Sequence, residues 1–131
     1  MSEGTDMRFE QLDVWKRASR LSCEIYRLTE SVSNWGFKDQ ITRSGLSVPS
    51  NIAEGEERET LKEKIRFLYY AKGSLGELVT QLYIGAEIEY LDKQIAMSMV
   101  KEAKELAKIL GALIKQKQAQ IKEDNADYQT K

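Results

Sequence analysis

The sequence predicts an all-α protein, an antiparallel up-down-up-down bundle of four helices. Apolar residues recur every three or four positions along most of the 131 residues, as they do on one face of a helix. No segment shows the alternation of a half-buried strand. Glycine and proline, which interrupt helices, occur only 8 times and once. With 41% hydrophobic and 31% charged residues, the composition is that of one globular domain.

The first helix is expected over residues 12–31. Its apolar stripe is formed by Val14, Ala18, Leu21, Ile25 and Leu28. Cys23, the one cysteine, lies in this apolar segment, so we expect a small core or semi-buried residue without a disulfide partner in the chain. A turn over residues 33–36 follows.

The second helix is expected from Gly36 to Glu54. Its stripe is formed by Phe37, Ile41, Val48 and Ile52. Pro49 should kink this helix, because proline removes one helical hydrogen bond and crowds the preceding turn. Gly55 fits the position just past the helix end.

The third helix is expected from a capping box at Thr60 to about Tyr90, and the fourth from a cap at Asp92 to about Gln118. Short connections between them favour antiparallel neighbours. Residues 1–8 and 119–131 lack the apolar pattern. We therefore expect a disordered leader, a bundle domain over residues 9–118 and a frayed C-terminal tail.

Two stretches, at residues 40–55 and 67–82, carry more small and polar residues than a bundle requires. The residues singled out as a structural motif are Gln40, Ser47, Pro49, Asn51, Glu54, Gly55, Gly73, Ser74 and Glu77. Gly73 should permit close approach of the helix backbone that carries Ser44 and Gly45. We expect the polar members to hydrogen-bond one another and fix the helix packing, with Glu77 paired to Arg43.

Several function classes are excluded or disfavoured by composition. The chain has no histidine and one cysteine, so it lacks the ligands of a thiolate–imidazole zinc site and the base of a histidine triad. We expect no enzymatic activity, cofactor or metal, although an enzyme or metal protein built on Glu54 and Glu77 stays an alternative. No apolar stretch is long enough to span a bilayer, and the N-terminus lacks the features of a secretory signal, so a cytoplasmic location is expected.

Charge is balanced overall but unevenly distributed. Twenty basic and 21 acidic residues give a net charge of −1, and all seven arginines fall between Arg8 and Arg66. Residues 101–117 carry five lysines and two glutamates, which is typical of a solvated helix face. The candidate phosphate contacts of a nucleic-acid-binding surface are Lys16, Arg17, Arg20, Arg27, Arg43 and Arg58.

The chain resembles a known family over roughly residues 8–117. The matching segments are Leu12-Asp13-Val14-Trp15-Lys16, Gln40-Ile41 with Arg43, Ser47-Val48-Pro49-Ser50-Asn51-Ile52-Ala53-Glu54-Gly55, Arg58, Gly73-Ser74 and Glu77-Leu78. They are similar to those of the four-helix-bundle proteins encoded in intervening sequences of bacterial 23S ribosomal RNA genes, the S23 family. Thr42 departs from the family pattern, which often has arginine there, and Glu56 and Glu57 replace its glycine-rich stretch.

The resemblance implies a homopentameric four-helix bundle without established enzymatic activity. Related proteins are accessory proteins of diversity-generating retroelements, which bind nucleic acid and a reverse transcriptase. The sequence is therefore interpreted as a cytoplasmic homopentamer that binds structured RNA, or DNA, through local basic patches. The alternative is a protein–protein adaptor, such as an accessory subunit of a reverse transcriptase.

Overall fold

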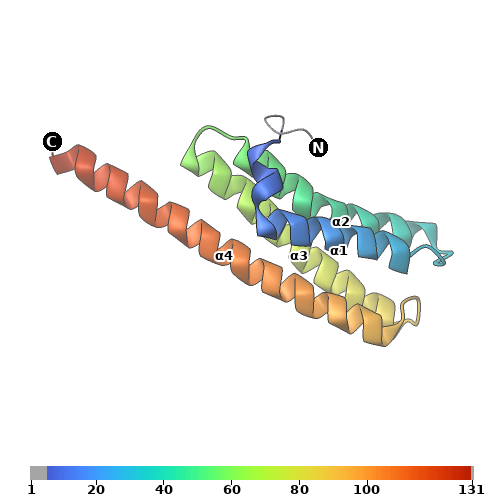
Figure 1. The fold of residues 1–131 in the computed structure, drawn as a ribbon. Coiled ribbons are helices and arrows are strands. Elements are labelled where there is room, and N and C mark those ends of the chain that lie inside the picture. The colour runs from blue at the N-terminus through green and yellow to red at the C-terminus, as the bar shows by residue number, and fades with distance from the viewer. Residues whose placement is uncertain (1–5, 131) are drawn as a thin grey trace.

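The computed structural model describes residues 6–130, which form one short 3₁₀ helix and four α-helices. In chain order these are η1 (Arg8–Gln11), α1 (Asp13–Leu28), α2 (Trp35–Glu56), α3 (Leu61–Glu87) and α4 (Lys93–Thr130). Each α-helix contacts the next along the chain, α1 also contacts α4, and successive helices run in opposite directions (Figure 1). The described residues contain no strand, so the predicted all-α bundle of four helices is confirmed.

Side-chain caps set three of the helix starts. Asn34 Oδ1 accepts from Phe37 N at 3.0 Å, Thr60 Oγ1 from Glu63 N at 3.2 Å, and Asp92 Oδ1 from Ile95 N at 2.9 Å. Each cap satisfies a backbone N–H that has no partner within its helix. The predicted caps at Thr60 and Asp92 are therefore confirmed.

The first and third helices end about three residues before their expected ends. In α1 the side chain of Thr29 donates to the carbonyl of Ile25 at 2.8 Å and closes the last turn. After α3, Glu89 has a φ of 64°, and Tyr90 N and Leu91 N both donate to Gly85 O, at 2.9 and 3.1 Å. This left-handed residue and its paired hydrogen bonds reverse the chain toward α4.

The fourth helix continues to Thr130, well past the end expected at Gln118. Figure 1 shows its C-terminal part extending beyond the other helices. No residue after Ile114 is buried among those whose side chains are described, 6–127, although Ile121 is half-buried. The expected leader falls largely on residues 1–5, outside the described part, and the division into leader, domain and tail stays a prediction.

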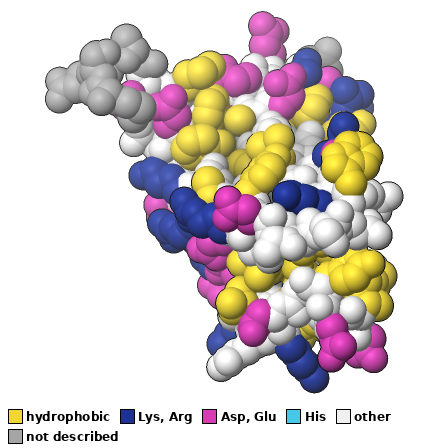
Figure 2. All heavy atoms as spheres, turned by 90° about the vertical axis from the view of Figure 1, so that its right-hand side faces the viewer, with side chains coloured by type: hydrophobic (Ala, Val, Ile, Leu, Met, Phe, Trp, Pro, Cys, Tyr) yellow, Lys and Arg dark blue, Asp and Glu magenta, His cyan; other side chains and the backbone are white. Residues whose placement is uncertain are grey.

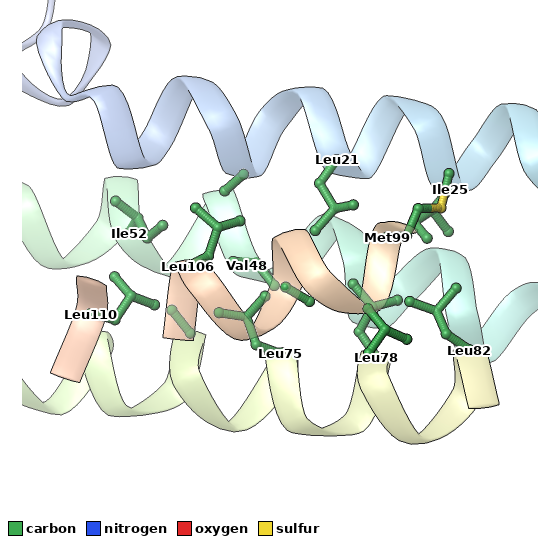
Figure 3. Packing of buried hydrophobic residues seen from close by; sticks show 14 of the residues in the cluster. Leu21, Ile25, Val48, Ile52, Leu75, Leu78, Leu82, Met99, Leu106 and Leu110 are labelled. Atoms are coloured by element: carbon green, nitrogen blue, oxygen red, sulfur yellow. The ribbon is translucent and has the colours of Figure 1, made fainter. Parts of the chain in front are cut away.

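The core runs along the bundle axis and is built from the predicted stripes (Figure 3). Its largest fully buried side chains include Ile25, Ile41, Ile52, Leu75, Leu78, Leu82, Leu106 and Leu110. Cys23 is not part of the core: its side chain is exposed, so that prediction is wrong. Helical phase explains the error, because position 23 lies on the outer face of α1 while Ser22 and Ile25 face inward.

The glycines differ from their expected roles. Gly55 lies inside α2 and is buried, and a Cβ there would approach Phe67 Cβ to 3.0 Å. The predicted approach of Gly73 to Ser44 and Gly45 is wrong, because no atom of another helix lies within 4 Å of the position that a Cβ would take at Gly73. The closest packing is instead at Gly85, where a Cβ would lie 2.6 Å from Leu91.

Pro49 is buried inside α2, which is helical from Trp35 to Glu56. The bend expected at this proline stays a prediction. Among the described residues no helix is both long and apolar enough to cross a membrane.

Candidate functional site

Three of the predicted basic residues form one exposed stripe on α1. Successive helical residues are about 100° apart, so Lys16, Arg20 and Arg27 point within about 40° of one another. All three are exposed, and none makes an ion pair with another residue of the described chain. Arg27 also lies in the last turn of α1, where positive charge is favourable. This stripe is free to contact an external anion.

Arg17 is already engaged with acidic side chains. Its Nη2 lies 2.6 Å from Glu102 Oε1 and 3.1 Å from Glu105 Oε1, and its Nε donates to Glu102 Oε2 at 3.0 Å. The hydrogen bonds that Arg17 donates to Glu102 and Glu105 raise the pKa of Arg17, and its bonds to Glu102 lower the pKa of that carboxyl group. Arg17 therefore joins α1 to α4, and a phosphate would have to displace two carboxylates to reach it.

Arg43 and Arg58 also have acidic neighbours, each four residues earlier in the chain. Arg43 Nε donates to both carboxylate oxygens of Asp39, at 3.1 and 3.0 Å, and not to Glu77, so that predicted pair is wrong. The preference is geometric, because residues four apart on one helix are neighbours. Arg58 pairs with Glu54 and lies 4.5 Å above the ring of Phe67. The six predicted residues are thus not one continuous site.

A row of lysines on α4 was missed by sequence reasoning. Lys101, Lys108, Lys115 and Lys122 follow one another at seven-residue intervals, with Lys104 beside them, and all five are exposed. Seven residues are nearly two helical turns, so the side chains share one face over about 32 Å. The signal available was this spacing, which a count of lysines does not reveal. We call these five residues the lysine row.

The neighbourhood of the lysine row keeps it positively charged. On α3, Lys72 adds a sixth positive charge next to the row. Its Nζ reaches Gly111 of α4, where it lies 3.9 Å from the position that a Cβ would take, and Lys72, Lys108 and Lys115 line one pocket. Glu102 and Glu105 of α4 are turned toward Arg17. By contrast, the end of the molecule formed by the α1–α2 and α3–α4 connections mixes both charge signs with exposed hydrophobic side chains (Figure 2).

The two polar stretches meet in a cleft between α2 and α3. This α2–α3 cleft has a volume of about 470 Å³, and its walls are formed by Gln40, Arg43, Ser44, Ser47, Ser74, Glu77 and Gln81. Ser47 Oγ donates to Ser44 O at 2.9 Å. The side-chain oxygen Oε1 of Gln81 is buried without a hydrogen-bond partner. Glu77 has no hydrogen bond or ion pair among the described residues.

The other predicted motif residues serve the helices themselves. Asn51 Nδ2 donates to Ser47 O at 2.9 Å, Glu54 pairs with Arg58, and Pro49 and Gly55 are buried in α2. Gly73 is exposed. The sequence therefore identified most of the cleft walls. It assigned them to helix packing, apart from Arg43 as a phosphate contact and Glu77 as an alternative catalytic or metal-binding residue.

A sequence model of the family described as "23S rRNA-intervening sequence protein" matches residues 10–112. The chain belongs to this family. The predicted family resemblance is thereby confirmed.

A solved structure supports the same assignment for this 23S rRNA-intervening sequence protein. It is a protein of unknown function from the S23 ribosomal protein family of Bacteroides thetaiotaomicron, with a TM-score of 0.73 and 25% sequence identity. The match covers 78% of this chain and 98% of the other. No curated protein matches the chain.

The carboxylates considered for catalysis or metal binding are separated in this family member. Glu77 lines the α2–α3 cleft, whereas Glu54 is paired with Arg58 and lies outside it. Within residues 6–127, no three side chains of the cysteine, aspartate and glutamate types gather as metal ligands would. The geometry therefore offers basic surfaces and a polar cleft, and it does not pair Glu54 with Glu77.

Proposed function

We propose that this protein is a non-enzymatic, homo-oligomeric nucleic-acid-binding protein that contacts the phosphates of structured RNA. The observation that carries the proposal is the lysine row on α4. Lysines spaced about 10 Å apart along a rigid helix can follow a phosphate backbone without reading base sequence. Since the net charge is −1, binding would depend on this local surface rather than on total charge.

The exposed stripe of α1 can extend the same surface. Helix α1 packs beside α4 through Arg17 and Glu102, and Arg20 is near enough to Glu102 to lower its pKa. Lys16, Arg20 and Arg27 would then contact phosphates next to the lysine row, with Arg17 holding the two helices together.

Neutral substitution of two central lysines tests this proposal. Lys108→Gln with Lys115→Gln preserves helix propensity and removes two positive charges. We expect the affinity for a labelled hairpin RNA, measured by fluorescence anisotropy, to fall roughly tenfold to a hundredfold. Lys117→Gln, on the same helix but at least about 140° around it from every residue of the row, is the matched control and should bind as the parent protein does. Equal loss in the control and the double variant would contradict the role of the row.

We also propose that copies of the chain assemble as a pentamer through the outer face of α3. Gly73 and Gly76 lie mid-helix on this face, and nothing within 4 Å of either explains the absence of a side chain. A glycine inside a helix costs about 1 kcal/mol relative to alanine. Tyr69 and Tyr83 flank them and are 49% and 42% exposed. A second helix packed against this face would use the glycines and cover the tyrosines.

The mass in solution tests the assembly. Light scattering should give five times the chain mass of 15.0 kDa, and Gly76→Arg should lower that mass by blocking close helix approach. Gln94→Arg, an exposed change on α4, should leave the mass unchanged. A parent protein of 15.0 kDa would refute assembly, and an unaffected Gly76→Arg oligomer would place the interface elsewhere.

A second candidate function is an adaptor that binds another protein, such as a reverse transcriptase. Trp35, at the start of α2, is 75% exposed, which favours a contact with another macromolecule. Capture of the same partner from host extract with and without nuclease would support the adaptor. Loss of the partner on nuclease treatment would favour the RNA-binding function.

A further inference from the structure

The α2–α3 cleft has hydrogen-bonding capacity that the chain itself leaves unused. Gln81 Oε1 is buried and accepts no hydrogen bond, and the Glu77 carboxylate in the same cleft has no partner among the described residues. A buried acceptor without a donor is unfavourable, as at Gln81, whereas the Glu77 carboxylate is exposed to solvent. Both groups are therefore suited to a ligand that supplies N–H or O–H donors.

Arg43, in the wall of the same cleft, requires an anionic group of the ligand rather than a donor. Asp39 contacts only its Nε, so the two terminal nitrogens remain available, and this side chain is 78% exposed. An arginine in the wall disfavours a simple cation, such as a metal ion or an amine. The cleft instead suits a ligand with a donor-rich edge at one end and an anionic group at the other.

We propose that the α2–α3 cleft binds a guanine nucleotide, either free or as an unpaired guanosine of an RNA. Guanine presents two adjacent donors, N1–H and the 2-amino group, which fit a carboxylate in a bidentate arrangement. Glu77 would accept both, Gln81 would accept the remaining amino hydrogen, and Arg43 would bind the 5′-phosphate. The hydroxyl of Ser74 would donate to guanine O6.

The shape and the other bases agree with this choice. The volume of about 470 Å³ lies within the roughly 300–1,000 Å³ typical of small-molecule sites. Adenine offers one donor beside an acceptor on its pairing edge, and that acceptor would face the Glu77 carboxylate. The site would add base selectivity to the proposed phosphate contacts, which are indifferent to sequence.

Calorimetric titration of the full chain with guanosine, inosine and adenosine monophosphates tests the cleft directly. We expect saturable binding of the guanosine nucleotide, about tenfold weaker binding of the inosine nucleotide, which lacks the 2-amino group, and still weaker binding of the adenosine nucleotide. Glu77→Gln should lower guanosine nucleotide affinity at least tenfold, whereas Glu87→Gln, at the end of the same helix, should not. Circular dichroism establishes that both variants are folded, and Gln81→Leu provides a second disruption of the cleft.

The proposal would be overturned if RNA binding does not depend on the loop base and the free nucleotides show either equal affinities or no saturable binding. Hairpins that carry one unpaired loop guanosine or inosine distinguish the two sources of the ligand. A preference for the guanosine hairpin without binding of the free nucleotide assigns the site to RNA, and binding of the free nucleotide alone assigns it to a mononucleotide. Failure of the lysine-row proposal is seen separately, as an RNA affinity that Lys108→Gln with Lys115→Gln leaves unchanged.

Discussion

Arg17 shows how one side chain can serve the fold rather than a ligand. It was selected as a phosphate contact because it lies among the basic residues of α1, yet it binds two carboxylates of α4. Spacing along α1 separates it from Lys16 by about 100°, enough to turn it toward another helix. The sequence alone could not predict its partners, because the angular placement of α4 around α1 is a property of the tertiary packing.

The pH dependence of stability should report this ion pair. The pKa of Glu102 is lowered in the folded state, so its carboxylate stabilises the fold above the ordinary glutamate pKa. That contribution is lost as the pH falls through the lowered folded-state value. We expect Glu102→Gln to reduce the free energy of unfolding by about 1 kcal/mol at pH 7 and by much less near pH 3, measured with urea. An equal reduction at both pH values would contradict the assignment.

Gly85 should be intolerant of even a methyl group. A Cβ there would lie 2.6 Å from Leu91 Cδ1 and 2.7 Å from Phe37 Cζ, and the Gly85 carbonyl anchors the turn into α4. We expect Gly85→Ala to lower the free energy of unfolding by about 1–3 kcal/mol. Gly111→Ala is the control: its nearest neighbour is Lys72 Nζ at 3.9 Å, so it should be neutral or stabilising by up to about 1 kcal/mol. Similar values for the two variants would refute the packing argument.

At the scale of helices, the apolar stripes and caps were the predictable part. The stripe residues of α1 and α2 are buried or half-buried as expected, and Thr60 and Asp92 cap as their spacing indicates. The end of α4 was less predictable. Beyond Gln118 the chain loses its apolar period, but lysine, glutamine, glutamate and alanine continue the helix without packing against a core.

Truncation after Gln118 separates stability from binding. No residue of α4 after Ile114 is buried in the part of the chain with described side chains, so we expect the free energy of unfolding to change by less than about 1 kcal/mol. RNA affinity should still fall, because Lys122 at the end of the lysine row is removed. A large loss of stability would mean that the C-terminal part of α4 contributes to the core or to assembly.

At the scale of the molecule, the sequence identified unusual residues but did not predict the sites that they form together. Ser47, Ser74 and Glu77 were expected to fix packing, and only their meeting across two helices reveals a cleft with unused acceptors. The lysines of α4 were counted, but their seven-residue spacing, which places them on one face of the helix, was not recognised. A net charge of −1 conceals this row, because electrostatic binding depends on how charges are distributed on the folded surface.

The salt dependence of RNA binding tests the central claim most directly. Each phosphate neutralised by a lysine contributes about 0.7–0.9 to the slope of log affinity against log salt concentration. We therefore expect the parent protein to bind hairpin RNA with a steep slope and Lys108→Gln with Lys115→Gln to lower that slope by about 1.4–1.8, while Lys117→Gln leaves it unchanged. A slope that is the same in the parent and the double variant would show that the lysine row does not contact the phosphates.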